Sequence, residues 1–328
     1  MKTAMSSLSA FRTRFWDRLP TSVDRRVRIV AWLSLAFQVV LIGTGGAVRL
    51  TGSGLGCPTW PRCTADSFIS TPEMGIHGVI EFGNRLLTFV LALIVIAAFL
   101  AVIRMRAERR DLFVLTLLQG LSIPFQAVLG GITVLTGLNP YIVGAHFIVS
   151  VGLVALMTML VYRVYFGPRG KIRVAPVWFT ATAHLTSLFV LVTVIVGILT
   201  TGSGPHAGDV TTPRNGLDTE FLQHLHSWPA YATLAGTVLL LAGAIAGGAG
   251  LSRTRRFVGL LFVVELAQIA VGITQARLGL PEVLVGTHMV LSGLLVGAMT
   301  AVVLSLRRSE PTVETSPAPT RDQVSLPV

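Results

Sequence analysis

Eight long runs of apolar residues constrain this chain more than any other feature. A transmembrane helix needs about 20 consecutive residues that are mostly apolar. The runs cover residues 27–49, 77–103, 112–134, 141–165, 176–200, 225–250, 255–277 and 282–306. Hydrophobic residues make up 52% of the 328 positions and charged residues only 12%, far from the balance of a soluble protein. The sequence therefore predicts an all-α integral membrane protein with eight transmembrane helices and no soluble domain.

The two ends of the chain are polar. Residues 1–26 lack the short apolar core and the cleavage site of a signal peptide, so we expect the first apolar run to remain in the protein as a helix. Residues 309–328 are rich in Pro, Ser and Thr, a composition that is typical of a disordered tail. The membrane part is therefore expected to lie between these two segments.

Positive charges gather on one side of the predicted membrane. The net charge is +11, and basic clusters precede the first run and occupy residues 104–110, 163–173, 253–256 and 307–308. Each of the later clusters follows an even-numbered run, whereas the loops on the other side hold isolated arginines. This asymmetry obeys the positive-inside rule and predicts a multi-pass protein of the cell membrane with both termini in the cytoplasm. Because the charge serves topology, nucleic acid is not expected as a partner.

An internal repeat divides the chain into two halves. Residues 126–150 align with residues 268–292 at an offset of 142 without a gap, and 8 of the 25 positions are identical. The tetrapeptide Thr-Gly-Ser-Gly also closes an apolar run twice, at residues 51–54 and 201–204. We therefore expect two pseudo-symmetric four-helix bundles, over residues 27–165 and 176–306. Both have the same orientation in the membrane because each contains an even number of spans.

The only two cysteines lie in the predicted loop over residues 50–76, after the first copy of the tetrapeptide. Cys57 and Cys63 are on the predicted outer side of the membrane, where disulfides form and persist. The residues alone leave two interpretations open: a disulfide that staples the loop, or a redox-active pair of thiols. Two thiols without a nearby histidine do not favour zinc, and the sequence lacks the Cys-x-x-Cys-His motif of covalent haem attachment.

Histidines at matched positions are the strongest candidates for metal ligands. His146 and His288 are related by the offset of 142, and His226 lies at the same predicted depth as His288. Ionisable side chains are costly inside a bilayer and are therefore functional candidates. Two imidazoles that converge from neighbouring helices are typical of haem ligation, and the alternative is hydrogen bonding to a neighbouring helix. The duplication favours ligation.

The first half has Asn84 where the second half has the other histidine of the pair. His77, Glu81 and Arg85 are spaced by four residues around it, so we expect all four side chains to share one helical face. A carboxylate there must be paired, metal-bound or protonated. One interpretation is a Glu81–Arg85 ion pair that orders the helix. The other is a reaction site in which Glu81 handles protons or positive charge and Arg85 or Arg49 binds an acidic group of a substrate.

Several motifs together resemble those of the haem A synthase family. They are GGAVRLTGSGLGCPTWPRC at residues 45–63, IEFGNR at 80–85, LTGLNP at 135–140 and TGSGPHAGD at 201–209. These motifs are specific, and the similarity extends over residues 29–306. The resemblance implies a protein that oxidises the C8 methyl group of haem O to a formyl group and so makes haem A for terminal oxidases.

The resemblance also implies roles for individual residues. His226 and His288 would be the axial ligands of a haem b in the second half. His146 would bind the iron of haem O in the first half, with Glu81 as the catalytic carboxylate. The two cysteines would take part as a Cys57–Cys63 disulfide or as thiols. Pathway logic adds haem O synthase as a partner, and the electron acceptor stays unnamed.

Asn84 departs from the Glu-x-x-His-Arg pattern of many family members. Either His146 alone binds the substrate iron, or His77 replaces the missing ligand from about 10 Å further along its helix. The main alternative function is a quinol-linked membrane cytochrome b that transfers electrons and does not modify haem. The combination of Asn84 with Glu81 argues against that alternative, which would need two complete histidine pairs. A transporter is a second alternative, because duplicated halves are common there.

Overall fold

The structure is a computed structural model that describes residues 14–309. Its eight long helices match the eight apolar runs, and each is long and apolar enough to cross a membrane. This confirms the predicted all-α, multi-span class. The predictions for residues 1–13 and for the tail from 310 onward lie outside the described residues. The helices are α2 (Arg25–Leu50), α3 (Gly75–Val102), α4 (Arg110–Leu135), α5 (Pro140–Phe166), α6 (Val177–Ser203), α7 (Thr219–Ala246), α8 (Ser252–Arg277) and α9 (Glu282–Ser305).

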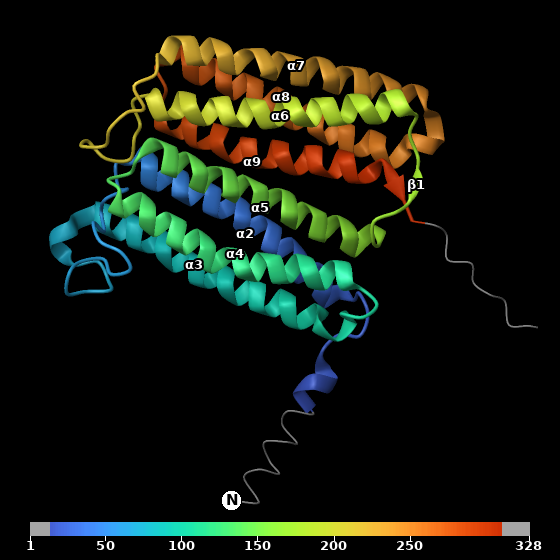
Figure 1. Cartoon of the computed structure of the whole chain (residues 1–328), viewed down its shortest axis with the longest axis horizontal. Coiled ribbons are helices and arrows are strands. Elements are labelled where there is room, and N and C mark those ends of the chain that lie inside the picture. Colours follow the sequence, from blue (N-terminus) through green and yellow to red (C-terminus); the bar gives the residue numbers. More distant parts are fainter. Residues whose placement is uncertain (1–13, 310–328) are drawn as a thin grey trace, which may run out of the picture.

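The helices lie side by side in two groups of four (Figure 1). In the first group the contacts run in a closed cycle from α2 to α3, α4, α5 and back to α2. The second group repeats this cycle from α6 to α7, α8, α9 and back to α6. The groups meet where α2 and α5 pack against α9 and where α5 packs against α6. Within each cycle, the second and fourth helices are diagonal to each other, so their facing side chains meet at the centre of the group.

The two ends of the helix array differ in composition. One end, called here the cysteine-loop end, carries the loops over residues 51–74 and 204–218. The opposite end, called the arginine-rich end, holds the start of α2 and a two-stranded antiparallel sheet of β1 (Ile172–Arg173) and β2 (Arg307–Arg308). This small sheet was not predicted. It ties the connection between the two groups to the end of α9.

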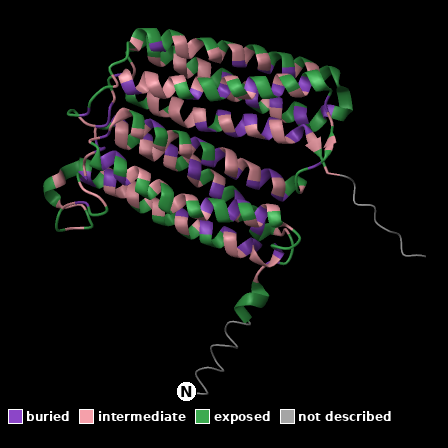
Figure 2. Cartoon of the chain, in the orientation of Figure 1, coloured by how far each residue is buried: buried purple, intermediate pink, exposed green. Residues whose placement is uncertain are grey.

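Buried residues follow the contact surfaces between the helices, and exposed residues cover the outside (Figure 2). The outward residues include many large apolar side chains, for example Phe89 and Leu93, which are each 69% exposed in the isolated chain. An apolar surface of this extent is unfavourable in water. It is the surface that a lipid bilayer covers, because lipid tails are as apolar as the side chains.

Helix boundaries differ from the sequence prediction where a loop residue caps a helix. Asp218 accepts a hydrogen bond from the backbone N–H of Phe221 (2.6 Å), so α7 begins at Thr219 rather than at 225. The second Thr-Gly-Ser-Gly copy is not a loop, because Thr201, Gly202 and Ser203 form the last turn of α6. Asn215 supports this extra turn, since its side chain donates to the Leu199 carbonyl oxygen (2.8 Å).

The turns between α4 and α5 and between α8 and α9 have the same backbone form. Gly137 and Leu138 both have positive φ angles (60° and 59°), as do Gly279 and Leu280 (74° and 64°). Leucine rarely adopts this left-handed region, so its occurrence at two positions related by the offset of 142 is specific. Each turn lies directly before the helix that carries His146 or His288.

Candidate functional site

His226 on α7 and His288 on α9 face each other at the centre of the second group. Their ring centroids are 6.3 Å apart, and the rings are inclined by 68°. An imidazole nitrogen binds a metal at about 2 Å, and the ring centroid lies roughly 1 Å behind that nitrogen. Two imidazoles on opposite sides of one metal ion therefore have centroids roughly 6 Å apart. The separation of the two rings fits a single ion between them.

Two glycines hold these rings in place. A β-carbon on Gly197 of α6 would lie 2.8 Å from Cε1 of His226, and one on Gly272 of α8 would lie 3.0 Å from Cε1 of His288. Both separations are shorter than an ordinary van der Waals contact. Glycine therefore allows each neighbouring helix to pack directly on an imidazole. Sequence reasoning identified the histidines and missed Gly197, because the matching position in the first half is Ala47.

The second half fits a haem better than a bare metal ion. Within residues 14–309, no group of three or more His, Cys, Asp or Glu side chains is arranged to hold a metal. The two facing imidazoles supply only two ligands, and a porphyrin supplies the other four itself. The Nδ1 atoms of His226 and His288 are buried and have no hydrogen-bond partner in the described part of the chain. The donor set therefore matches bis-histidine haem ligation.

The first half repeats half of this arrangement around His146 on α5. A β-carbon on Gly130 of α4 would lie 3.4 Å from Cε1 of His146. The corresponding distance from Gly272 to Cε1 of the matching His288 is 3.0 Å. The Nε2 of Gln126 donates to the His146 carbonyl oxygen at 3.4 Å and to the Ser150 hydroxyl at 2.8 Å. In the second half, Gln268 makes the corresponding bond to the carbonyl oxygen of His288 (3.2 Å).

Asn84 on α3 lies diagonal to α5 and points to another helix. Its side-chain oxygen accepts a hydrogen bond from the hydroxyl of Thr44 on α2 (2.8 Å). Asn84, His77, Glu81 and Arg85 all lie on α3, so they keep the shared helical face that their spacing predicts, but they contact different neighbours. Asn84 contacts α2, and the other three contact the cysteine loop. The difference arises because a helical face of this width touches two neighbours.

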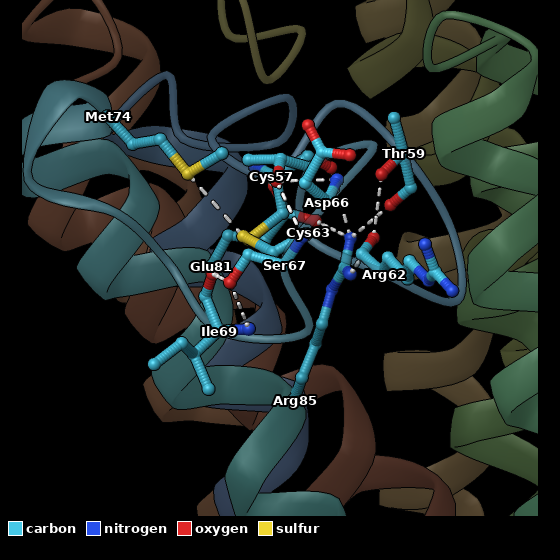
Figure 3. The surroundings of a disulfide bond; sticks show 11 residues. Cys57, Thr59, Arg62, Cys63, Asp66, Ser67, Ile69, Met74, Glu81 and Arg85 are labelled. Carbon is cyan, nitrogen blue, oxygen red and sulfur yellow. Dashed lines mark hydrogen bonds and ion pairs between the residues drawn. A yellow bond between two sulfur atoms is a disulfide. The ribbon is translucent and has the colours of Figure 1, made fainter.

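Glu81 and Arg85 bind the cysteine loop together (Figure 3). One carboxylate oxygen of Glu81 accepts a hydrogen bond from the backbone N–H of Cys57 (2.6 Å), and the other pairs with Arg85 (2.6 Å). Arg85 also donates to the carbonyl oxygens of Cys57 (3.1 Å), Thr59 (3.3 Å) and Arg62 (3.3 Å). Glu81 is only 5% exposed, so these donors compensate a charge that would be costly alone.

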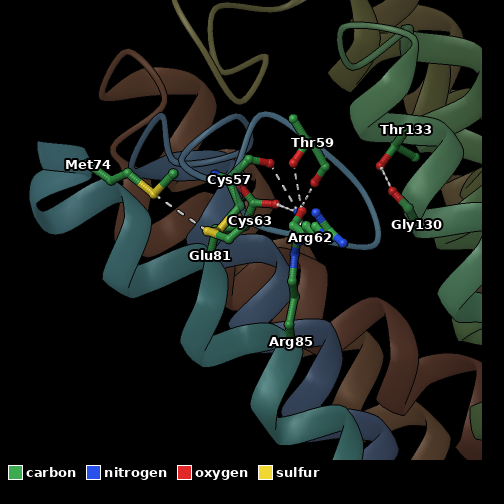
Figure 4. A network of polar contacts seen from close by, with 9 residues as sticks. All are labelled: Cys57, Thr59, Arg62, Cys63, Met74, Glu81, Arg85, Gly130 and Thr133. Atoms are coloured by element: carbon green, nitrogen blue, oxygen red, sulfur yellow. Dashed lines mark hydrogen bonds and ion pairs between the residues drawn. A yellow bond between two sulfur atoms is a disulfide. The ribbon is translucent and has the colours of Figure 1, made fainter. Parts of the chain in front are cut away.

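Cys57 and Cys63 form a disulfide, and both are fully buried. The bond closes a ring of seven residues, and Glu81 and Arg85 make their hydrogen bonds to the backbone of this ring. Trp60, at the middle of this ring, lies against Gly131 of α4, where any β-carbon would collide with the indole. Figure 4 shows the ring between Arg85 and the α4 turn that contains Gly130. The disulfide loop is thus fixed between α3 and α4, close to the helix turn that touches His146.

The other predicted site residues have protein partners. Nδ1 of His77 lies 2.9 Å from the Ser53 hydroxyl, and His77 borders a hollow of about 490 Å³ beside Asp209. The Thr211 hydroxyl and backbone N–H donate to Asp209 and hold the pKa of this carboxyl below its usual value. Arg49 donates to the carbonyl oxygens of His206 (2.7 Å) and Thr201 (3.0 Å).

In one of the two interpretations of the sequence, Arg85 or Arg49 binds an acidic group of a substrate. In the structure both guanidinium groups bind backbone carbonyl oxygens, and Arg85 also binds Glu81. Arg49 thereby joins the end of α2 to the loop over residues 204–218. The sequence contains no signal for these contacts, because the partners are main-chain atoms of distant segments. The Glu81–Arg85 pair at i and i+4 was among the predicted interpretations.

These features define a multi-pass helical membrane protein. One half has a pair of facing histidines, and the other has a buried carboxylate that accepts a hydrogen bond from the backbone of a disulfide-closed loop. The sequence profile of the COX15-CtaA family, described as cytochrome oxidase assembly protein, matches residues 28–300. This match covers most of the chain, with six of the eight transmembrane helices in full and most of α2 and α9. The chain belongs to this family.

Curated relatives agree with this assignment. The chain is 24% identical over 263 residues to a heme A synthase of Bacillus licheniformis, an alignment that covers 75% of this chain and 85% of the relative. It is 35% identical over 130 residues to a heme A synthase of Bacillus pumilus, covering 38% of this chain and 41% of that relative. A heme A synthase of Halalkalibacterium halodurans is 30% identical over 145 residues, or 43% of this chain and 48% of the relative. The chain thus spans less than half the length of two of these relatives and most of the third.

Proposed function

We propose that this protein is a haem A synthase, which oxidises the C8 methyl group of haem O to a formyl group and so provides haem A for terminal oxidases. The observation that carries the proposal is the asymmetry between the halves. The second half has two facing histidines, whereas the first keeps one histidine and adds Glu81, held by the Cys57 N–H and Arg85. A cytochrome that only transfers electrons would need a complete histidine pair in each half, so this difference does not fit it.

The first half would bind haem O as the substrate. His146 would bind the iron, and Asn84, which is engaged with Thr44, leaves the opposite side without a histidine ligand. A single strong ligand suits a reacting haem, because a second one would occupy the other face of the iron. The bond from Gln126 to the His146 main chain fixes the helix turn from which the imidazole projects.

The reaction converts a methyl to a formyl group in two successive two-electron oxidations. In the proposed order, water supplies the oxygen of each of two hydroxylations at C8. In each step a C–H bond is replaced by a C–OH bond, two protons are released and two electrons leave to a separate acceptor. The resulting geminal diol then loses water to give the formyl group. Each oxidation releases protons and develops positive charge beside the reacting carbon, and a fixed carboxylate stabilises that charge or takes up a proton. Glu81 would have this role. The Cys57 N–H and the Arg85 guanidinium hold its two oxygens in place, so little reorganisation is needed during the reaction.

The second half would hold a haem b between His226 and His288. A haem with two axial histidines supplies reversible one-electron transfer when it is bound. Gly197 and Gly272 fix the two rings by direct packing, so the ligands keep their positions. The acceptor that finally takes the electrons is a separate component.

The setting and the partners form part of the same proposal. The protein would lie in the plasma membrane with its arginine-rich end in the cytoplasm, because the basic clusters obey the positive-inside rule. Haem O synthase would supply the substrate. The disulfide loop would then lie on the oxidising side of the membrane, which agrees with the bond between Cys57 and Cys63.

The test is haem analysis in cells that make haem O and lack their own haem A synthase. We expect haem A only when the chain is expressed, and we expect Glu81→Gln to abolish it while the purified protein keeps its haem b. Glu282→Gln, which changes an exposed carboxylate at the same end of the helices, is the matched control and should keep full activity. Bound haem b without any haem A, in cells supplied with a working electron acceptor, would instead support the electron-transfer cytochrome.

A further inference from the structure

The outward face of α2 at the arginine-rich end carries an ordered stripe of side chains. Arg25, Arg28, Ile29, Trp32, Leu33 and Ala36 follow the spacing of one helical face, and all six are exposed. Together with Tyr165 of α5 they line a hollow of about 430 Å³. The stripe begins with two arginines and continues with apolar groups for about 12 Å along the helix, from Arg28 to Ala36.

The aromatic part of this hollow is fixed by specific contacts. The indole N–H of Trp32 donates to the hydroxyl of Tyr165 (3.1 Å), which links α2 to α5. The guanidinium of Arg28 lies 5.5 Å from the centroid of the Tyr165 ring, within the range of a cation–π contact. Trp and Tyr side chains prefer the level of lipid headgroups. Trp32 is one helical turn from Arg28 and two from Arg25, so the headgroup level falls just below the two arginines.

The two arginines of the stripe have no acidic partner of their own. Among residues 14–309, the ion pairs within 4.0 Å that involve this segment join Arg26 to Asp24, and none involves Arg25 or Arg28. Two adjacent guanidinium groups present several N–H donors in a geometry that suits phosphate oxygens. The part of the hollow beside Arg25 and Arg28 is therefore complementary to an anionic group, and the apolar part beside Leu33 and Ala36 is complementary to a hydrocarbon chain.

We propose that this hollow is a binding site for one anionic phospholipid. Its phosphate is bound by Arg25 and Arg28, and one acyl chain lies over Ile29, Leu33 and Ala36. Trp32 and Tyr165 mark the boundary between the two parts. A lipid is the one occupant that combines an anionic head with a hydrocarbon tail in the order of the stripe. The bound lipid would brace α2 against α5 at the end where the disulfide loop is absent.

The test uses the purified full chain in nanodiscs and measures quenching of tryptophan fluorescence by brominated lipid. Phosphatidylglycerol and phosphatidylcholine are compared at the same mole fractions, and a Trp32→Phe variant gives the share of the signal that belongs to Trp32. Each basic residue near an anionic surface contributes about a fivefold factor, so two should give a preference of roughly 30-fold for phosphatidylglycerol at this site.

Three variants separate the site from general attraction of anionic lipids. Arg25→Gln with Arg28→Gln should abolish the preference. Arg255→Gln with Arg256→Gln removes the same charge from exposed positions at the same end of the helices and should preserve it. Ala36→Phe keeps the charges but fills the hollow, and it should reduce binding as well. Equal quenching by the two lipids in the wild type would overturn the proposal. So would an equal loss of the preference for phosphatidylglycerol in the two double-arginine variants.

Discussion

A substitution at Gly272 tests whether the facing arrangement of His226 and His288 serves to bind haem. The change is Gly272→Ala, which adds one methyl group 3.0 Å from Cε1 and 3.5 Å from Nδ1 of His288. Carbon atoms in contact prefer separations of about 3.5–4.0 Å, so the ring must move by roughly 0.5–1 Å. The displaced ring no longer faces His226 at the separation that fits a shared iron.

The size of the effect follows from packing energies. Overpacking by a methyl group costs about 1–3 kcal/mol. If this cost falls on the ligated state, the affinity for haem b decreases roughly 5- to 150-fold. Alanine is also a better helix former than glycine by about 0.5–1 kcal/mol, so the helix itself should not be weakened.

The matched control lies on the same helix. Gly259 of α8 has no atom within 4 Å of the position where a β-carbon would stand. Gly259→Ala should therefore retain wild-type haem affinity while it has the same gain in helix propensity. The assay is transfer of haem to apomyoglobin from the purified protein, followed by absorption spectroscopy, with the thermal midpoint of the haem-free protein as a check on folding.

The outcome discriminates between ligation and simple helix packing. If Gly272→Ala loses haem faster than Gly259→Ala while both haem-free proteins unfold at the same temperature, the glycine positions a ligand. Wild-type haem transfer and an unchanged spectrum in Gly272→Ala would refute the reasoning, because they would show that the ring can move without effect on the bound haem.

Two further predictions concern the cysteine-loop end. Replacing both Cys57 and Cys63 by Ser removes a constraint worth about 2 kcal/mol for a seven-residue ring and frees the loop that holds Glu81. We expect the double variant to lose haem A formation and to retain haem b. Reduction of the disulfide in the wild type should have the same effect. Haem A formation that persists in the double variant would contradict the link between the disulfide and the role of Glu81. Arg49→Gln removes one charged hydrogen bond to the second loop at His206 and one to the last turn of α6 at Thr201, and it should lower stability by about 1.5–3 kcal/mol, as measured by the thermal midpoint. An unchanged midpoint would show that these bonds do not hold the loop.

Much of the fold was accessible from the sequence because membrane proteins obey strong local rules. A backbone that crosses lipid must satisfy its own hydrogen bonds, so a long apolar run has to be a helix. This rule located all eight helices. The ends were less predictable, since caps such as Asp218 and the extra turn at Thr201–Ser203 depend on contacts with residues in the following loop.

The candidate site was predicted only in part. The repeat identified His146 and His288, and helical spacing connected Glu81 to Arg85. The partners of these side chains were not predictable, because Cys57 meets Glu81 through its backbone N–H, and every residue except proline has such a group.

The sequence by itself determined the class of protein, the number of membrane spans and which residue types are available for ligation and catalysis. It did so because hydrophobic length, charge asymmetry and internal repetition are properties of single segments. The tertiary structure alone decided that the rings of His226 and His288 face each other at 6.3 Å, that Asn84 accepts a hydrogen bond from Thr44, and that Glu81 accepts one from the Cys57 N–H. These facts depend on the relative rotation and distance of separate helices, which glycine contacts and main-chain hydrogen bonds set and which no local pattern encodes.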